Sequence, residues 1–328
     1  MPLSGSASDK HGHFTIFPGL RRRERRTARS AWRYNAKSNF ARGLGMDLIT
    51  WNIQSCRGCD GRVDPKRIVD VCRSMADFDV LCLQEVARNY PDLSGASGED
   101  QYALLSGLLP GFSAMEGIAT DVLGAADKRR QFGNLILTRY AVIQVFRHLL
   151  PWPADPGVPG MQRIALELVL AAPFGPVRVT TTHLEYYSEM QRRQQVNRLR
   201  ELHAEAAEHR ADRNHAKKEG GPFQTMPRPA SAILTADFNF RADDPLHARI
   251  VSPYSDGTPA YRDAWQLRHG ERPHDHTIGV HDREQWPEAF ACDFIFVTDD
   301  IAGRVEDVAV NPDTDASDHQ PVLLRLKD

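Results

Sequence analysis

Residues 231–240 read Ser-Ala-Ile-Leu-Thr-Ala-Asp-Phe-Asn-Phe. The apolar run through Ile233 and Leu234 predicts a buried strand, which ends at Asp237 and Asn239. Because alternate side chains of a strand point to the same face, this strand would present a carboxylate and a carboxamide together. Taken alone, the segment is more typical of an Asx turn, since buried strands normally end in turn residues. The rest of the chain favours a functional role.

The remainder of the chain alternates between strand and helix patterns, which is typical of an α/β domain. Expected strands occupy residues 47–52, 80–84, 132–137, 164–170, 177–182, 233–236, 294–297 and 321–326. Expected helices occupy residues 65–75, 101–109, 188–209 and 245–251. The turn at 173–176 predicts a hairpin, and residues 217–229, rich in Gly, Pro and Lys, predict a loop or lid. No repeat or linker is visible, so we expect one domain over residues 46–328.

The basic residues are concentrated near the N-terminus. Residues 1–45 contain ten Lys or Arg and two Asp or Glu, whereas residues 46–328 contain 31 and 41. This composition predicts a solvated, disordered tail. Two alternatives are open: the tail contacts nucleic acid or an anionic surface, or Met46 is the true start, because strong strand patterning begins directly after it. The body is acidic, which argues against a tight non-specific grip on duplex DNA.

Composition also narrows the class of protein. An apolar fraction of 41% over 328 residues is ample for a globular core. No apolar run approaches the ~18 residues of a membrane-spanning helix, and no apolar signal segment follows the basic residues near the N-terminus. We therefore expect a cytoplasmic protein without a transmembrane segment and leave its oligomeric state open. The five cysteines have no disulfide-scaffold spacing, and Cys56-x-x-Cys59 lacks the second pair of a zinc site.

Polar residues able to do chemistry stand where the expected strands begin or end. They are Asn52, Glu85, Asn134, His183, Asp237, Asn239, Asp293, Asp318 and His319. Each alone could be a cap, a turn or a surface charge, but α/β proteins assemble their sites at such strand ends. Carboxylate and amide oxygens suit Mg²⁺ or Mn²⁺. The set has no cysteine nucleophile, and the chain has no Gly-x-Ser-x-Gly elbow and no Walker loop, so covalent acyl transfer and nucleotide-switch chemistry have no support.

Seven segments of the chain follow the order seen in a known superfamily. They are Thr50-Trp51-Asn52, Leu83-Gln84-Glu85, Gly133 to Arg139, Thr182-His183-Leu184, Ala236-Asp237-Phe238-Asn239, Asp293 to Val297, and Ser317-Asp318-His319. On these segments the chain from residue 46 onward resembles the endonuclease/exonuclease/phosphatase superfamily. The resemblance implies a deoxyribonuclease I-like fold, which is a four-layer α/β/β/α sandwich with two packed mixed β-sheets. It also implies metal-dependent hydrolysis of a phosphate ester at one end.

The resemblance further implies a metal centre and contacts to the substrate phosphate. Glu85 would be the main Mg²⁺ (or Mn²⁺) ligand with Asn52 beside it, and Asp318 would serve near the metal or beside the adjacent histidine. Asn239 would hydrogen-bond the phosphate, and Asn134 is either a second phosphate contact or an organiser of its loop. Such a site makes physical sense, because the anionic ester repels a nucleophile unless a Lewis acid and hydrogen-bond donors offset its charge.

The remaining residues are implied to carry out the chemical step. Asp237 would orient and deprotonate the attacking water. His319 would stabilise the charge of the transition state, held in orientation by Asp293. An Asp–His pair of this kind fixes the imidazole tautomer and favours its cationic form. His183 would contact a phosphate oxygen or assist the leaving group.

Three other places leave alternatives open. Asp263 could cap a helix or serve the site. His274 and His276 could bind a metal, but a loop on the substrate side is the favoured interpretation. The arginines that could build a local substrate-binding patch are Arg163, Arg192 and Arg193.

The sequence therefore predicts a divalent-metal-dependent hydrolase of phosphate esters. A phosphodiesterase acting on nucleic acid or a small diester is the first choice, and a phosphomonoesterase or phospholipid phosphodiesterase is the alternative. A different class of protein, a catalytically inactive binding member of the same fold, is disfavoured because Glu85, Asp237 and His319 are all present. The Thr-His-Leu form at 182–184 differs from the Tyr-x-Pro-Asn segment of apurinic endonucleases, so that specialised activity is not expected.

Overall fold

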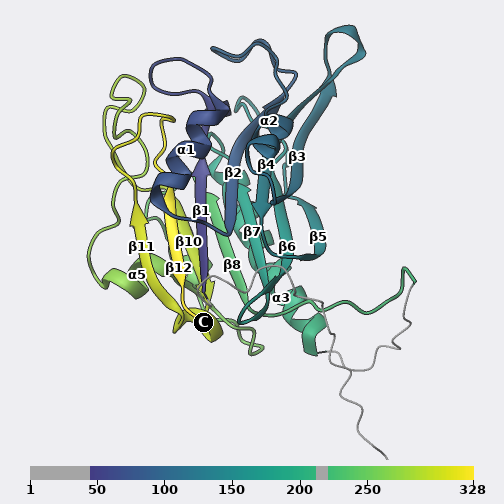
Figure 1. The fold of residues 1–328 in the computed structure, drawn as a ribbon. Coiled ribbons are helices and arrows are strands. Elements are labelled where there is room, and N and C mark those ends of the chain that lie inside the picture. The colour runs from purple at the N-terminus through teal and green to yellow at the C-terminus, as the bar shows by residue number, and fades with distance from the viewer. Residues whose placement is uncertain (1–44, 212–220) are drawn as a thin grey trace, which may run out of the picture. The chain divides into compact units, whose positions relative to one another are not determined.

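The computed structural model describes residues 45–211 and 221–328 (Figure 1). The predicted tail, except for Gly45, lies outside the described residues, and so do residues 217–220 of the predicted loop. All statements below concern the described residues.

Two six-stranded mixed sheets form the body of the protein. The first sheet has the order β11 (Val305–Val310), β12 (Val322–Leu326), β1 (Met46–Asn52), β2 (Val80–Arg88), β4 (Arg129–Thr138), β3 (Ser113–Leu123). The second has the order β5 (Val142–Leu149), β6 (Ile164–Ala172), β7 (Gly175–His183), β8 (Ala232–Asp237), β10 (Asp293–Thr298), β9 (Tyr261–Asp263). The pairs β1–β2 and β7–β8 are parallel, and the other neighbours are antiparallel.

The alternation of side chains along each central strand explains why the two sheets stack. In β1, Leu48 faces the core between the sheets, whereas Ile49 and Trp51 face a second core beneath α1 (Pro65–Met75). In β10, Ile295 joins the inter-sheet core, and its neighbours face a third core beneath α3 (Glu189–Ala211). A strand that is apolar on both faces must be covered on both sides, which requires a layered sandwich.

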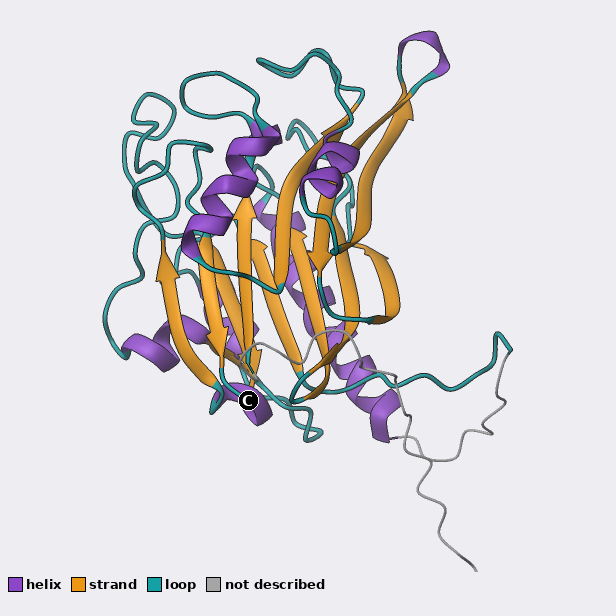
Figure 2. Cartoon of the chain, viewed as in Figure 1, coloured by secondary structure: helices purple, strands orange, loops and turns teal. Residues whose placement is uncertain are grey.

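Helices cover the outer faces of both sheets (Figure 2). The helices are α1, α2 (Gln101–Leu108), α3 (Glu189–Ala211), α4 (Pro245–Val251), α5 (Ala264–His269) and α6 (Asp299–Ala302), with short 3-10 turns η1 (Gln54–Cys56) and η2 (Ala125–Asp127). α1 begins at Pro65 because the Asp64 side chain accepts hydrogen bonds from the next two free amides. The arrangement confirms the predicted α/β sandwich with two packed mixed sheets. No helix in the described part of the chain is long and apolar enough to cross a membrane.

Four strands were not predicted, namely β3, β5, β9 and β11, and these are the edge strands of the two sheets. Their residues are largely half-buried or exposed, as in β5 and β11. An edge strand lacks the continuous apolar run of a strand covered on both faces, so its sequence resembles a polar loop. β2 also extends beyond its predicted end, through a β-bulge between Leu83 and Val86.

Candidate active site

The register of the second sheet brings three predicted residues side by side. His183 is paired with Asp237 across β7 and β8, and Asp237 is paired with Asp293 across β8 and β10. The first sheet supplies Asn52 from the end of β1, and the Asn52 amide donates to Asp237 Oδ2 at 2.9 Å. The predicted residues from both sheets therefore meet at one end of the sandwich.

His319, in the loop before β12, is held on several sides. Its Nδ1 lies 2.9 Å from Asp293 Oδ2 and its Nε2 lies 3.6 Å from Asp237 Oδ2. Its carbonyl accepts a bond from the Trp51 indole at 2.9 Å, and its amide donates to Ser317 Oγ at 3.2 Å. Burial opposes the charged ring, but the Asp293 and Asp237 carboxylates outweigh it and hold the pKa of His319 well above its usual value. We therefore describe His319 as a cation near neutral pH.

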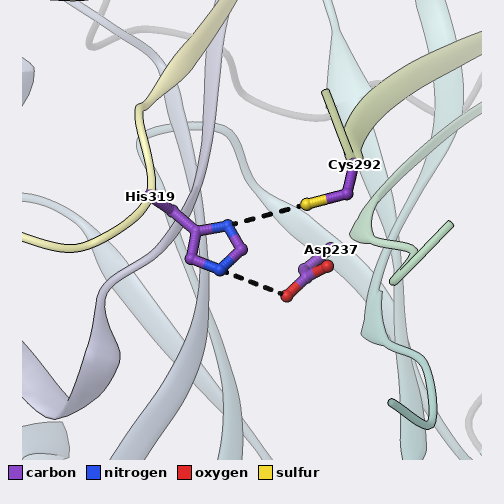
Figure 3. A group of neighbouring side chains, drawn as sticks. All are labelled: Asp237, Cys292 and His319. Carbon is purple, nitrogen blue, oxygen red and sulfur yellow. Dashed lines mark hydrogen bonds and ion pairs between the residues drawn. The ribbon is translucent and has the colours of Figure 1, made fainter. Parts of the chain in front are cut away.

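Cys292 is a neighbour that the sequence pattern did not identify. Figure 3 shows its side chain beside His319 and Asp237, and its Sγ lies 4.0 Å from His319 Nδ1. The three ligand atoms converge, as they would around a metal. However, Nδ1 is already bonded to Asp293, and burial raises the pKa of the Cys292 thiol well above its usual value. A neutral thiol is a poor ligand and nucleophile, so Cys292 acts here as a small buried side chain.

Glu85 reaches the site because of the bulge in β2. Its backbone has φ = 59°, a left-handed conformation that is strained for a residue with a Cβ, and its side chain is 26% exposed. The Asn52 amide donates to Glu85 Oε1 at 3.0 Å. Burial, with the charge of Asp318 as the next cause, raises the pKa of Glu85 to about 7. The pKa of Asp237 is likewise raised to about 6, chiefly by burial.

The donor set fits a hard divalent cation. After burial, the charges of Asp318 and Asp237 raise the pKa of Glu85 further, and the cationic ring of His319 opposes this rise. A Mg²⁺ ion bound at Glu85 would relieve this repulsion, because carboxylate oxygens are the ligands that it prefers. Asp318 is oriented by the Trp286 indole, which donates to its Oδ2 at 3.2 Å.

Asn52 is oriented as a donor in this arrangement. Its Oδ1 accepts from the Gln54 amide at 3.1 Å, which turns its Nδ2 toward the carboxylates of Glu85 and Asp237. A metal would need the oxygen instead. The predicted ligand role of Asn52 stays a prediction, while its bridging role between the two carboxylates is part of the structure.

His183 and Asn239 flank Asp237. His183 Nε2 lies 3.3 Å from Asp237 Oδ2, and its Nδ1 lies 3.9 Å from Glu85 Oε1. Burial, with Arg163 as the next cause, keeps the pKa of His183 well below its usual value, so the ring is neutral. Asn239 has φ = 53°, and its backbone N–H donates to Asp237 Oδ1 at 3.0 Å, whereas its side-chain Nδ2 donates to the Leu184 carbonyl at 2.9 Å. Both residues thus adjoin Asp237, and their contacts to phosphate stay predictions.

Asn134 lies deeper than the other residues. It is 2% exposed, and its Nδ2 donates to the carbonyl of Ile164 at 3.0 Å, which ties β4 to the second sheet. Nearby, the Gln84 amide donates to Thr50 Oγ1 at 3.1 Å and to Thr181 Oγ1 at 2.7 Å. These buried amides organise the floor of the site. The phosphate contact predicted for Asn134 is not tested by this arrangement.

The predicted surface patch of arginines is wrong for one of its three residues. Arg163 is buried and its Nε pairs with Glu185 Oε2 at 3.2 Å, so it cannot present its charge on the surface. Arg192 is half-buried and donates to the carbonyls of Glu185 and Tyr186, whereas Arg193 is exposed. Arg163 and Glu185 are buried as a pair, because an unpaired buried charge would be costly.

A second group with metal-ligand spacing shares no residue with the first. The Nε2 atoms of His247 and His274 each lie 2.8 Å from Asp263 Oδ2. Asp263 is also the N-cap of α5, which confirms the capping alternative. His276 lines a surface cavity of about 540 Å³ beside His274. Sequence analysis did not identify His247, which lies in α4 with no motif around it.

A family model described as the Endonuclease/Exonuclease/phosphatase family matches residues 49–319. This chain belongs to that family. Family membership supports hydrolysis of phosphate esters. No curated protein matches this chain significantly in sequence.

Solved structures of family members share the fold. One is an endonuclease/exonuclease/phosphatase from Beutenbergia cavernae, with 22% identity, a TM-score of 0.63, and coverage of 87% of this chain and 72% of that chain. A mannosyl-6-phosphatase from Bacteroides thetaiotaomicron has 18% identity, a TM-score of 0.59, and coverage of 85% and 98%. TDP2 of D. rerio complexed with a single-strand DNA product has 16% identity, a TM-score of 0.54, and coverage of 87% and 99%. At these identities the likeness shows the fold alone.

Proposed function

We propose that this protein is a divalent-metal-dependent phosphodiesterase that uses Mg²⁺ or Mn²⁺. The observation that carries the proposal is that Glu85, Asp237 and the cationic ring of His319 all lie around the side-chain amide of Asn52, with the charge of Asp318 acting on Glu85. Hydrolysis of a phosphate ester needs compensation of the ester's charge, a base for water and a donor to the developing negative charge. This group of residues can supply all three.

Glu85 and Asp318 are the residues that would hold the cation. When bound, the cation would act as a Lewis acid on the phosphate oxygens. The left-handed backbone of Glu85 is consistent with such a role, because strain of this kind is typically kept at functional sites. Asn52 fixes the spacing of Glu85 and Asp237 by donating to both.

Asp237 is the proposed general base. With a pKa of about 6, this carboxylate is mostly charged at neutral pH and is more basic than an ordinary aspartate. The backbone N–H of Asn239 donates to one of its oxygens and the side chain of Asn52 donates to the other, so the carboxylate is fixed before substrate arrives. The proton of the attacking water would pass to this carboxylate.

His319 is the proposed donor to the transition state. Nδ1–H of the ring donates a hydrogen bond to Asp293, so Nε2–H faces the site beside Asp237. The neutral ring of His183 is placed to contact a phosphate oxygen or the leaving group. Because these groups are fixed by the fold, they need little reorganisation during the reaction.

The charge balance favours a diester over a monoester. A diester carries one negative charge, whereas a phosphate monoester carries about 1.5 to 2 near neutral pH. The described site offers one protonated histidine against several carboxylates, since His183 is neutral. A monoester is the second candidate, and the mannosyl-6-phosphatase among the solved relatives motivates testing it.

The test compares bis(p-nitrophenyl) phosphate with p-nitrophenyl phosphate in Mg²⁺, Mn²⁺ or EDTA. We expect faster hydrolysis of the diester, which EDTA abolishes and Glu85→Gln reduces strongly. A preference for the monoester would redirect the assignment to a phosphatase. Hydrolysis that persists in EDTA would contradict the metal-dependent mechanism, and bound metal without hydrolysis of either ester would favour a binding protein of the same fold.

A further inference from the structure

Three aromatic side chains gather at the rim of the candidate active site, and we refer to Tyr186, Tyr187 and Trp286 as the aromatic rim. Tyr186 is 45% exposed and Tyr187 is 62% exposed. The Tyr186 and Trp286 rings meet edge to face at 5.8 Å, and the two tyrosine rings meet at 4.9 Å. Large aromatic side chains that cluster on a surface, rather than being scattered over it, mark a binding surface.

The aromatic rim is attached to the site on both sides. Tyr186 follows His183 by three residues, at the end of β7. Trp286 donates its indole N–H to Asp318 Oδ2 at 3.2 Å. The Tyr186–Trp286 contact therefore joins the His183 side of the site to the Asp318 side. A ligand that places a phosphate at Asp237 can reach this rim with an adjacent group.

The two tyrosines are held rigidly at their backbone. The buried Glu185 carboxylate accepts the amides of Tyr186 at 3.0 Å and Tyr187 at 3.1 Å through one oxygen. Its other oxygen pairs with Arg163, and Arg192 donates to the Tyr186 carbonyl at 2.9 Å. A buried ion pair thus fixes an exposed aromatic surface. Rigid aromatic groups bind with little loss of conformational entropy.

A cavity of about 540 Å³ lies next to Trp286, since Pro287 and Phe290 belong to its lining. Its charged lining residues are Arg241, which pairs with Glu288 at 3.0 Å, and Asp243 and Arg283. Trp286 contacts Phe290 of this cavity at a ring distance of 6.3 Å. In residues 45–211 and 221–328, no hydrogen bond or ion pair engages the side chain of His276 or Arg283. The guanidinium of Arg283, a cation without an internal partner, is therefore available for an anion of the ligand.

We propose that the aromatic rim stacks a nucleobase next to the cleaved phosphate and that the adjacent cavity accepts a neighbouring phosphate. The substrate class is then single-stranded nucleic acid, and this inference rests on the phosphodiesterase function proposed above. A flat ring beside one phosphate and a second anionic group is the repeating unit of such a strand. Stacking on an aromatic side chain requires an unpaired base, and the acidic body disfavours duplex DNA.

The first test uses three esters with the same leaving group and measures kcat/KM in Mg²⁺. They are the p-nitrophenyl ester of thymidine 5′-phosphate, the same ester of abasic deoxyribose 5-phosphate, and methyl p-nitrophenyl phosphate. We expect the thymidine ester to exceed both others by about 5- to 150-fold, the range that stacking of one base supplies. Equal values for thymidine and abasic esters would overturn the inference, because the sugar rather than the base would then be recognised.

The variants test whether the aromatic rim causes that preference. Tyr186→Ala and Tyr187→Ala should each lower the thymidine-to-methyl ratio of kcat/KM by at least about fivefold, whereas Tyr186→Phe and Tyr187→Phe should keep it. Phe223→Ala is the control, because it removes an exposed aromatic side chain (82% exposed) that does not belong to the aromatic rim. An unchanged ratio in both alanine variants would overturn the inference.

Two outcomes separate this inference from the proposed function. Hydrolysis of the methyl ester without any preference for thymidine would refute the aromatic rim alone and leave the phosphodiesterase intact. Failure to hydrolyse any diester would refute the phosphodiesterase and the inference together.

As a second arm, single-stranded oligothymidylate should compete with the thymidine ester more strongly than thymidine 5′-phosphate or a duplex, and Arg283→Ala should reduce that advantage. Equal competition by the duplex would contradict the single-strand assignment.

Discussion

The described residues contain two buried histidine–aspartate clusters, and only one of them has the perturbed pKa values and backbone strain typical of an active site. In the active-site cluster, His319 Nδ1 lies 2.9 Å from Asp293. In the second cluster, His247 and His274 each lie 2.8 Å from Asp263. The hydrogen-bond distances are nearly the same, so distance alone does not distinguish function from structure.

The second cluster is internally satisfied. Asp263 uses Oδ2 for the two histidines and Oδ1 for the amides of Trp265 and Gln266 at the start of α5. Burial disfavours the Asp263 charge, but the bonds from both histidines outweigh it and lower its pKa to about 2. The His274 ring also stacks on Trp265. Every feature of this cluster stabilises α5 on its sheet.

The active-site cluster is only partly compensated by the protein. The pKa of Glu85 is raised to about 7 and that of Asp237 to about 6, in each case mainly by burial. Glu85 and Asn239 adopt left-handed backbone conformations, and Asp293 Oδ1 has no hydrogen-bond partner among the described residues. Uncompensated charge and backbone strain, rather than the histidine–aspartate pair itself, therefore mark the functional cluster.

The largest expected effect is on catalysis. Asp237→Asn should lower kcat for bis(p-nitrophenyl) phosphate by about 10²- to 10⁴-fold, because the amide cannot accept the proton of water. Initial rates at saturating Mg²⁺ measure this loss, with circular dichroism and the unfolding temperature as controls for folding. A variant that keeps nearly full activity would remove Asp237 from the mechanism and erase the distinction between the two clusters.

The next effect should be on stability alone. Asp263→Ala removes a helix cap and leaves two buried histidines without their acceptor, so it should lower the free energy of unfolding by about 2–4 kcal/mol. Urea denaturation measures the change. The kcat/KM of the folded fraction should stay within about threefold of wild type. A fall in kcat/KM comparable to that of Asp237→Asn would instead place Asp263 in the active site.

The smallest effect has the opposite sign. Because the folded-state pKa of Glu85 lies above its ordinary value, the metal-free protein loses stability as pH rises from about 4.5 to about 7. Glu85→Gln in EDTA at pH 7.5 should therefore raise the free energy of unfolding by about 1–3 kcal/mol and flatten its pH dependence. Denaturation of both proteins at pH 5 and pH 7.5 measures the difference. A variant that is less stable than wild type at pH 7.5 would show that the Glu85 charge is already compensated.

Much of the fold could be predicted because the central strands are apolar on both faces. α1 and α4 were predicted with the bounds that the structure shows, since a proline at the first turn and an aspartate before it define each start. The edge strands could not be predicted, because solvent replaces one neighbour and removes the apolar pattern. The bulge that turns Glu85 into the site has no signal in the sequence, since it depends on the pairing of β2 with β4.

The candidate site was predicted less evenly. Residues next to predicted strands were identified because their motifs adjoin a buried strand, which Asp237 ends and His319 precedes. Cys292 and Trp286 were not, because each touches the site through tertiary contacts rather than through a motif. The predicted arginine patch failed at Arg163, because its buried partner Glu185 follows it by more than twenty residues and only the fold brings them together.

The most direct measurement is the Mg²⁺ dependence of diester hydrolysis. Wild type, Glu85→Gln and Asp263→Asn are each stripped of metal with EDTA and then titrated with Mg²⁺ in parallel. If Glu85 holds the catalytic cation, Glu85→Gln should require at least about tenfold more Mg²⁺ for half-maximal activity, since an amide is a weaker ligand than a carboxylate. Asp263→Asn should keep the wild-type midpoint. The same midpoint in wild type and Glu85→Gln, or a shift confined to Asp263→Asn, would contradict the assignment of the active site.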